Sequence, residues 1–290
     1  MLAAKSHEAL VRLLTDFPDH SAPQDREFEK GFKLADIRLV AGFLTLVRQT
    51  PLRQALPYTF AALRLTGLEV EVFADYTPTF TNIRANECFD HSQRRKHLEN
   101  FLLARLSRQS EHESLIKDVL LHEITTQHLL DMPTRTFSKS MTRHSPLDSQ
   151  TCLTLNGHII SHAMEYQPLQ FIQICGNNAE KAVLANASNI IEQIDALERR
   201  KRILIWWRPA EPSQQHLDVF ELDSQSNYLL HMVDDTKNVG EILQIVSRQL
   251  DSNITEQDLL VFYEDCMKNG LVTPALKIKR NGETDENRIH

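Results

Sequence analysis

The sequence predicts an α+β protein, with an all-helical N-terminal domain followed by a winged helix-turn-helix domain that combines a small antiparallel sheet with three helices. Residues 2–130 hold few glycines, and their apolar residues recur at three- and four-residue spacing, which is typical of helices. Residues 131–150 are rich in Ser, Thr, Pro and basic residues, which favours a boundary between domains. Short β-branched and aromatic runs come next and precede three further helical patterns.

We therefore expect residues 1–132 to form a helical domain and residues 133–150 a linker. Residues 151–276 are expected to form the winged helix-turn-helix domain, and residues 277–290, which have almost no apolar content, a flexible tail. With 290 residues and 41% hydrophobic content, the chain has enough apolar material for two cores of modest size.

The helical domain is predicted to begin with a helix that carries a leucine stripe at residues 10–14. A second helix is expected over residues 27–49 and ends there because Pro51 disfavours helical backbone in the residue before it. The apolar residues of this second helix are predicted to face inward: Phe28, Phe32, Ile37, Val40, Phe43, Leu44 and Val47.

The rest of this domain is also predicted to be mainly helical. One or two shorter helices broken at Pro57 are expected over residues 52–72, and residues 75–82, with the sequence DYTPTFTN, are predicted to form a turn. Leucine-rich stripes then predict helices around residues 98–106 and 115–129, so that this half forms a helical bundle or array.

The second half shows strand patterns. Strands are predicted over residues 151–155 and 158–164, joined as a hairpin by the turn pair Asn156-Gly157. A helix over 179–200 and strands over 203–207 and 217–222 are expected to follow. Three helices then close the domain, within residues 228–232, 239–250 and 255–267.

The last of these helices is the most clearly marked. Thr255 and Asp258 form a near capping box at its start, and Gly270 is suited to the left-handed residue that ends a helix.

Composition excludes several classes of partner. Lys and Arg number 32 against 39 Asp and Glu, a net charge of −7, and no long basic stripe is present, so nucleic acid is not expected as a partner. No window reaches the roughly 18 uninterrupted apolar residues of a membrane span, so membrane contact is not expected. The four cysteines form no CxxC pair, which agrees with a reducing compartment, and a cytoplasmic location is expected.

The histidines suggest a metal site, but their spacing argues against one. His122-Glu123 and His128 resemble part of a zinc-binding helix, yet such a helix needs its two histidines four residues apart on one face, and these are six apart. His122 is expected on the bundle surface or in a polar contact. His158 and His162 share one face of a predicted strand but lie some 13 Å apart along it. No metal ligands are predicted.

Other signatures of catalysis are missing. The sequence has no glycine-rich phosphate loop and no nucleophile elbow. Cys152, Cys175 and Cys266 lie in apolar stretches where a thiol usually acts as a small hydrophobic residue. At most one of Trp206 and Trp207 is expected to face outward, because neighbours in a strand alternate. We predict neither catalytic nor cofactor-binding residues.

A winged helix-turn-helix domain has two common uses. On DNA, its recognition helix would meet phosphates, but the helix TEQDLLVFYEDCMKNG carries four acidic residues against Lys268. The other use adds a peptide strand to the edge of the sheet, beside an apolar helix. Leu260, Tyr263 and Met267 recur along one helical face and suit such a groove, although the same residues could equally be core.

Several segments resemble a known family. They are LNGHIISHAMEYQPL, RKRILIWWRPAE, LDVFELDSQSNYLLHMVDDTKNVGEIL and DLLVFYEDCMKNGLV, and more loosely IKDVLLHEITTQHLL. Together they resemble the leader-peptide-recognition partner subunits of multinuclear non-heme iron-dependent oxidative enzymes, which mature ribosomally made peptide natural products. The likeness is strongest to members that serve 3-thiaglutamate biosynthesis.

The resemblance implies a non-catalytic subunit of a heterodimer. Such a subunit holds the leader of a precursor peptide as an added β-strand and docks, with help from its helical domain, on an iron enzyme that removes the β-carbon of the peptide's C-terminal cysteine and leaves 2-mercaptoglycine. The iron then belongs to the partner subunit, and this chain needs no cofactor.

Carried onto this chain, the resemblance assigns the receiving edge to residues 217–223, with an opposing wall on the last helix. The peptide-binding residues would be Leu217, Val219, Phe220, Glu221, Leu222, Leu260, Tyr263, Glu264 and Met267. Two alternatives stay open: a winged-helix transcriptional regulator, and an enzyme with a histidine-bound metal.

Overall fold

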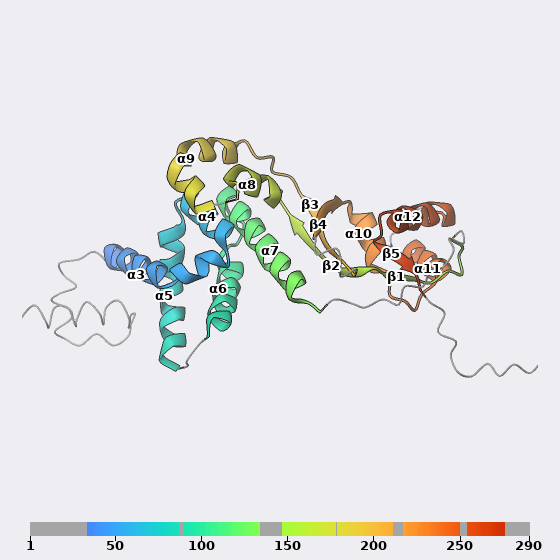
Figure 1. Ribbon diagram of the computed structural model, residues 1–290, viewed down its shortest axis with the longest axis horizontal. Coiled ribbons are helices and arrows are strands. Elements are labelled where there is room, and N and C mark those ends of the chain that lie inside the picture. Colours follow the sequence, from blue (N-terminus) through green and yellow to red (C-terminus); the bar gives the residue numbers. More distant parts are fainter. Residues whose placement is uncertain are drawn as a thin grey trace, which may run out of the picture. The chain divides into compact units, whose positions relative to one another are not determined.

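The computed structural model is an α+β protein and describes residues 34–86, 90–133, 147–177, 179–210, 217–249 and 254–275 (Figure 1). The chain divides into two compact units. Unit 1 comprises residues up to Ile124 and residues 165–201, and unit 2 comprises residues 125–164 and those from Arg202 onward. The predicted first helix, the predicted tail and most of the predicted linker lie outside the described residues.

Unit 1 is helical. Its elements are α3 (Leu34–Arg48), the 3-10 helix η1 (Thr50–Gln54), α4 (Pro57–Leu65), α5 (Glu69–Asn86), α6 (His91–Arg105), α7 (Glu111–Asp131, of which residues up to Ile124 belong here), α8 (Pro168–Cys175) and α9 (Ala179–Asp195). Buried leucines and aromatic residues from these helices form a single cluster, in which the rings of Phe60 and Phe73 stack with centroids 5.7 Å apart.

The units do not follow the predicted boundary at residues 133–150. Helices α8 and α9 lie within the segment predicted for the winged domain, yet Phe171, Cys175 and Ile190 are buried in the core of unit 1. The sequence shows that these helices have an apolar face. It does not show which of the two cores that face packs into, because this depends on contacts between residues far apart in the sequence.

Two carboxylates of α7 tie distant segments of unit 1 together. The carboxylate of Glu123 accepts hydrogen bonds from the backbone N–H groups of Tyr58 and Thr59, both at 2.8 Å, and from the Thr59 hydroxyl at 2.6 Å. These N–H groups belong to the first turn of α4 and have no partner within that helix. Asp118 accepts in the same way from the N–H groups of Glu165 and of the next residue, both at 2.8 Å.

Helix α3 packs on α5 through small and polar residues. Ala41 and Thr45 are buried along its inner side, together with Leu46. A Cβ atom at Gly42 would lie 2.6 Å from the carbonyl oxygen of Val70, so only glycine allows the two helices to approach this closely.

The predicted inner face of α3 is wrong. Val40, Phe43, Leu44 and Val47 are 37–54% exposed and point away from α5. The stripe with Ala41 and Thr45 and the stripe of large apolar residues both recur at helical spacing. The close approach of α5 at Gly42 leaves room only for the stripe with the smaller residues, which is therefore the buried one. Phe28 and Phe32 lie outside the described residues, as does the side chain of Ile37.

The turn predicted over residues 75–82 is also wrong, because α5 continues through Pro78. Tertiary packing overrides the proline, because Tyr76 and Thr77 directly before it are buried. The Thr77 hydroxyl lies 2.9 Å from that of Thr45 on α3. Pro78 itself is exposed, so its ring faces solvent. Because proline has no N–H group, it removes one backbone hydrogen bond from the helix.

Unit 2 holds two small antiparallel sheets. Strand β1 (Leu153–Leu155) pairs with β5 (Val272–Pro274), while β2 (Gly157–Met164), β3 (Arg202–Pro209) and β4 (Asp218–Leu222) pair in the order β2-β3-β4. The predicted hairpin between the first two strands is therefore wrong, since β1 and β2 belong to different sheets. Gly157, with φ of 123°, turns the chain between them, and a Cβ there would lie 2.1 Å from the Arg208 carbonyl oxygen.

Strand β3 is covered on both faces. On one face, Trp207 packs with the cluster formed by α10 (Ser224–His231), α11 (Val239–Gln249) and α12 (Glu256–Lys268). On the other, the ring of Trp206 lies 5.5 Å from that of His162, which in turn hydrogen-bonds Thr125 of α7 at 2.8 Å. The two Trp side chains alternate as predicted, but both are buried, so neither is available for recognition.

The three closing helices and their caps are confirmed. Thr255 and Asp258 form the capping box of α12, and Gly270 adopts the left-handed conformation, with φ of 76°.

The carboxyl end of α7 is held in unit 2 by Arg208 of β3, whose guanidinium donates to the carbonyl oxygens of Leu130 at 3.1 Å and Met132 at 2.6 Å.

The inner side of α3 gives a testable prediction. Gly42→Ala is expected to lower the free energy of unfolding by about 1–3 kcal/mol, because the added methyl overlaps the backbone of α5. Val40→Ala on the exposed side of the same helix serves as the control and is expected to change it by less than about 0.5 kcal/mol. Urea unfolding measures both; equal losses would contradict the assignment of the two sides.

Candidate functional site

The predicted receiving strand lies at an edge of the three-stranded sheet. β4 pairs with β3 from Asp218 opposite Trp207 to Leu222 opposite Ile203. Among the described strands, none pairs with the outer side of β4. This side therefore presents the backbone N–H and C=O groups of alternate residues to a further strand. Leu217, half-buried, directly precedes the strand.

The side chains of β4 alternate between the two faces of the sheet. Phe220 and Leu222 pack against the buried cluster of the three helices. Val219 and Glu221 lie on the opposite face, and the Glu221 carboxylate is 3.7 Å from the guanidinium of Arg202 on β3. A peptide strand added at this edge would meet an apolar surface on one face and a charged pair on the other.

The residues predicted on α12 differ in depth. Leu260 and Met267 are half-buried against the three-helix cluster, and Glu264, on the same side of the helix, is exposed. Tyr263 is fully buried, and its hydroxyl donates to the carbonyl of Leu229 at 3.0 Å. Burial raises the pKa of this phenol. Tyr263 therefore belongs to the core and, contrary to the prediction, does not line a surface.

The structure brings four of the remaining predicted residues to one cluster. Phe220 and Leu222 from β4, and Leu260 and Met267 from α12, pack against the same buried residues, which include Leu259. In Figure 1, β4 and α12 are both seen in unit 2, and α10 follows β4 directly along the chain. Residues of β4 and of the partly buried side of α12 thus pack on one apolar cluster.

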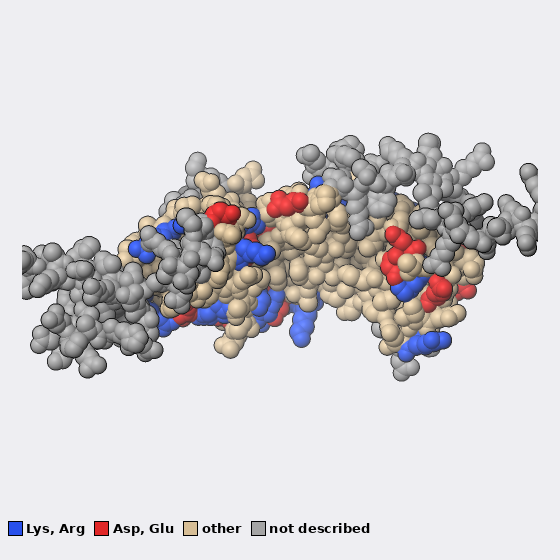
Figure 2. Space-filling model, turned by 90° about the horizontal axis from the view of Figure 1, so that it is seen from below, with Lys and Arg blue, Asp and Glu red and all other residues tan. Residues whose placement is uncertain are grey.

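The charge of α12 does not suit a DNA-reading helix. Glu256, Asp258, Glu264 and Asp265 are exposed, against Lys268, which pairs with Asp265 at 3.0 Å. On the face drawn in Figure 2, basic side chains of the described residues are interspersed with acidic ones. Exposed carboxylates on a recognition helix would repel phosphates.

On α7, His122 is buried within unit 1 and Glu123 is partly buried. His122 is 8% exposed and therefore does not lie on the bundle surface, and burial lowers its pKa to about 4. Burial also raises the pKa of Glu123 to about 7, although its three hydrogen-bond donors act in the opposite direction. His128 is exposed. Within the described residues, no group of three His, Cys, Asp or Glu side chains is placed to hold a metal.

The two histidines of β2 lie on one face of the sheet, as predicted, and each has a separate partner. His162 contacts Thr125, and the Nε2 atom of His158 lies 3.0 Å from the carbonyl oxygen of Pro133. These contacts give both rings a structural role.

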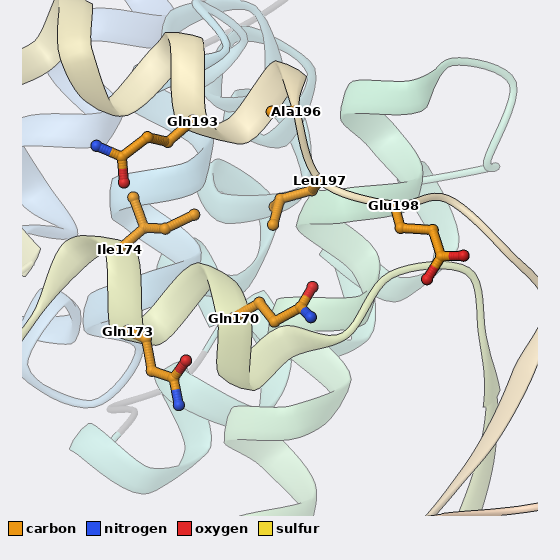
Figure 3. Close-up of a pocket in the computed structure, with 7 residues that line it drawn as sticks. All are labelled: Gln170, Gln173, Ile174, Gln193, Ala196, Leu197 and Glu198. Atoms are coloured by element: carbon orange, nitrogen blue, oxygen red, sulfur yellow. The ribbon is translucent and has the colours of Figure 1, made fainter.

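Unit 1 contains a shallow hollow between α8 and the end of α9 (Figure 3). Ile174 and Leu197 face each other across it, and amide side chains surround them, while Gln173 points away. Its lining consists of Gln170, Gln173, Ile174, Gln193, Ala196, Leu197 and Glu198. Glu198 is the only group in this lining that could act as an acid, a base or a nucleophile, and the lining holds no second such group beside it, so we assign no catalytic site here.

The α-helices in the described part of the chain are all too short or too polar to cross a bilayer. Comparison of the sequence with known protein families and with curated proteins finds no match.

The His122-Glu123 pair on α7 predicts opposite pH dependences. The folded-state pKa of His122, about 4, is below its ordinary 6.5, so its contribution to stability is present above pH 6.5 and is lost as the pH falls towards 4. The folded-state pKa of Glu123, about 7, is above its ordinary 4.5, so its contribution is present below pH 4.5 and is lost as the pH rises through 7.

Between pH 6.5 and 4.5 these two contributions therefore oppose each other. Relative to the wild type, His122→Gln is expected to gain stability as the pH falls, and Glu123→Gln to lose it, by at most about 1.4 kcal/mol per pH unit. Urea unfolding at stepped pH checks this; two variants with the wild-type pH profile would refute it.

Proposed function

We propose that this chain is the recognition subunit of an enzyme complex and is not itself catalytic. It binds the leader region of a ribosomally made precursor peptide as a strand added to the outer edge of β4. The observation that carries the proposal is this edge, which no described strand pairs and which lies beside apolar residues held on a common cluster. The resemblance of the β2 to α12 segments to leader-recognition subunits supports it.

In this function, β2 to β4 and α10 to α12 act as a winged helix-turn-helix domain. The added strand would form a ladder with the outward backbone groups of β4, which gives affinity largely independent of the peptide's sequence. Its alternate side chains would reach Phe220 and Leu222 on one face, with Leu260 and Met267 as the apolar wall, and Glu221 on the other. Specificity would come from these side-chain contacts.

The edge of β4 suits a leader better than the second edge of the sheet on β2. At β2, the His158 ring contacts the carbonyl of Pro133 and the His162 ring contacts Thr125, so the end of α7 and the residue after it already cover one face of that strand. On β4, Phe220 and Leu222 pack against the apolar cluster, and an apolar side chain of the ligand could pack beside them.

The bound peptide would present its C-terminal cysteine to a separate, multinuclear non-heme iron subunit in the cytoplasm. As the resemblance implies, that subunit uses dioxygen to remove the cysteine β-carbon and leaves 2-mercaptoglycine, as in 3-thiaglutamate biosynthesis. The iron ligands belong to that subunit, and this chain contributes the peptide's position.

A proline scan at β4 tests strand addition. The N–H groups of neighbouring strand residues point to opposite sides, so one of Val219 and Phe220 directs its N–H towards β3 and the other outward. Proline at the outward position is expected to keep the fold and weaken leader binding at least tenfold, because it removes a ladder donor. Proline at the other position is expected to lower the melting temperature.

Threonine at the same two positions is the matched control, because it keeps the N–H. Binding is measured by fluorescence anisotropy with the labelled leader of a precursor peptide that ends in cysteine. If the wild type binds no leader, the proposed function fails; if both proline variants fold and bind like the wild type, strand addition at β4 fails.

A further inference from the structure

Helix α3 exposes an unusual concentration of large apolar side chains. Leu39, Val40, Phe43, Leu44 and Val47, which we call the outer α3 face, are 37–54% exposed. The other exposed large apolar residues of the described chain, Leu130, Ile191 and Val261, lie singly on α7, α9 and α12. Single exposed apolar residues are ordinary at a protein surface, but a contiguous set marks an interaction site.

The outer α3 face is not a by-product of packing on α5. The helix buries Ala41, Thr45 and Leu46 on its inner side, yet five other large apolar residues of the same helix stay exposed. Full burial of each large side chain would stabilise the folded state by about 1.5–3 kcal/mol, a gain that is left unused here. A surface with this arrangement is suited to burial against something else.

The spacing of the face indicates the shape of its partner. Val40, Phe43 and Val47 repeat at three and four residues, as at the a and d positions of packed helices, and Leu39 and Leu44 flank them at the g and e positions. No charged residue interrupts this stripe. Such a stripe accepts an apolar helix that runs along it.

We propose that the outer α3 face docks the catalytic subunit, which lays an apolar helix along it. This inference rests on the proposed function, which requires such a subunit. The five side chains offer on the order of 500 Å², and two copies paired through α3 alone would bury about 1,000 Å², below the roughly 1,200–2,000 Å² of stable interfaces. A second copy is therefore the weaker occupant, whereas a larger partner adds contacts around the stripe.

A matched pair of valines tests the assignment. Val40 on α3 is 48% exposed and Val261 on α12 is 47% exposed, so Val40→Asp and Val261→Asp add the same charge at equal exposure. Val40→Asp is expected to weaken binding of the full chain to a purified multinuclear non-heme iron enzyme of the proposed class at least tenfold. Val261→Asp is expected to leave that binding unchanged. Leader affinity and melting temperature are measured for each variant.

The outcomes separate the two proposals. If the wild type forms the complex and Val40→Asp binds the enzyme as tightly as Val261→Asp, the docking surface is wrong while the proposed function stands. If the wild type binds the leader but forms no complex, docking is also wrong. If the wild type binds no leader, the proposed function itself fails.

Thiol labelling identifies any other occupant. In the full-length Phe43→Cys chain, maleimide modification at position 43, followed by peptide mass spectrometry, is expected to be fast for the chain alone and at least tenfold slower with the iron enzyme. Slow labelling at every concentration of the chain alone would mean that its own residues cover the face. Slowing only at high concentration would mean that a second copy does. Either result would overturn the proposal.

Discussion

The burial of β3 on every side is the constraint on which the candidate site depends. This strand pairs with β2 and β4, and the side chains of Trp206 and Trp207 are buried on its opposite faces. A ligand therefore has no access to the central strand. Only the outer edges of the sheet can take up an extended peptide. Of these, β4 contributes Phe220 and Leu222 to the surface of the cluster that includes α12, whereas β2 contributes Ile159.

A second constraint shapes unit 1. The buried carboxylates of Asp118 and Glu123 on α7 accept backbone N–H groups from segments 47 and 64 residues away in the sequence. A buried N–H group without an acceptor destabilises the fold. These hydrogen bonds therefore favour the structure in which α4 begins beside Glu123 and the segment before α8 lies beside Asp118.

Local signals in the sequence predict local structure well. The capping box of Thr255 and Asp258 and the left-handed Gly270 bound α12 as expected, because both are set by neighbouring residues. Strand pairing was harder: Asn156-Gly157 has the chemistry of a hairpin turn, but β1 finds its partner in β5, far along the chain. Pro78 favours a turn over residues 75–82, but the helix continues through it. The burial of the residues around it stabilises the helix by more than the lost backbone hydrogen bond destabilises it.

The candidate site shows the same limit. Helical spacing correctly groups Leu260, Tyr263, Glu264 and Met267 on one side of α12, but it does not give their depth, and Tyr263 proves to be core. On α3, spacing alone does not say which of two stripes is buried. The stripe of Ala41, Gly42 and Thr45 was the available signal, since small residues at helical spacing permit close helix contact.

Amide hydrogen exchange, resolved by residue, tests the central claim most directly. When the leader peptide is added to the full chain, we expect slower exchange at alternate residues of β4, those with outward N–H groups, and little change along β2. Protection of β2 instead, or of neither strand in a chain that binds the peptide, would contradict strand addition at β4.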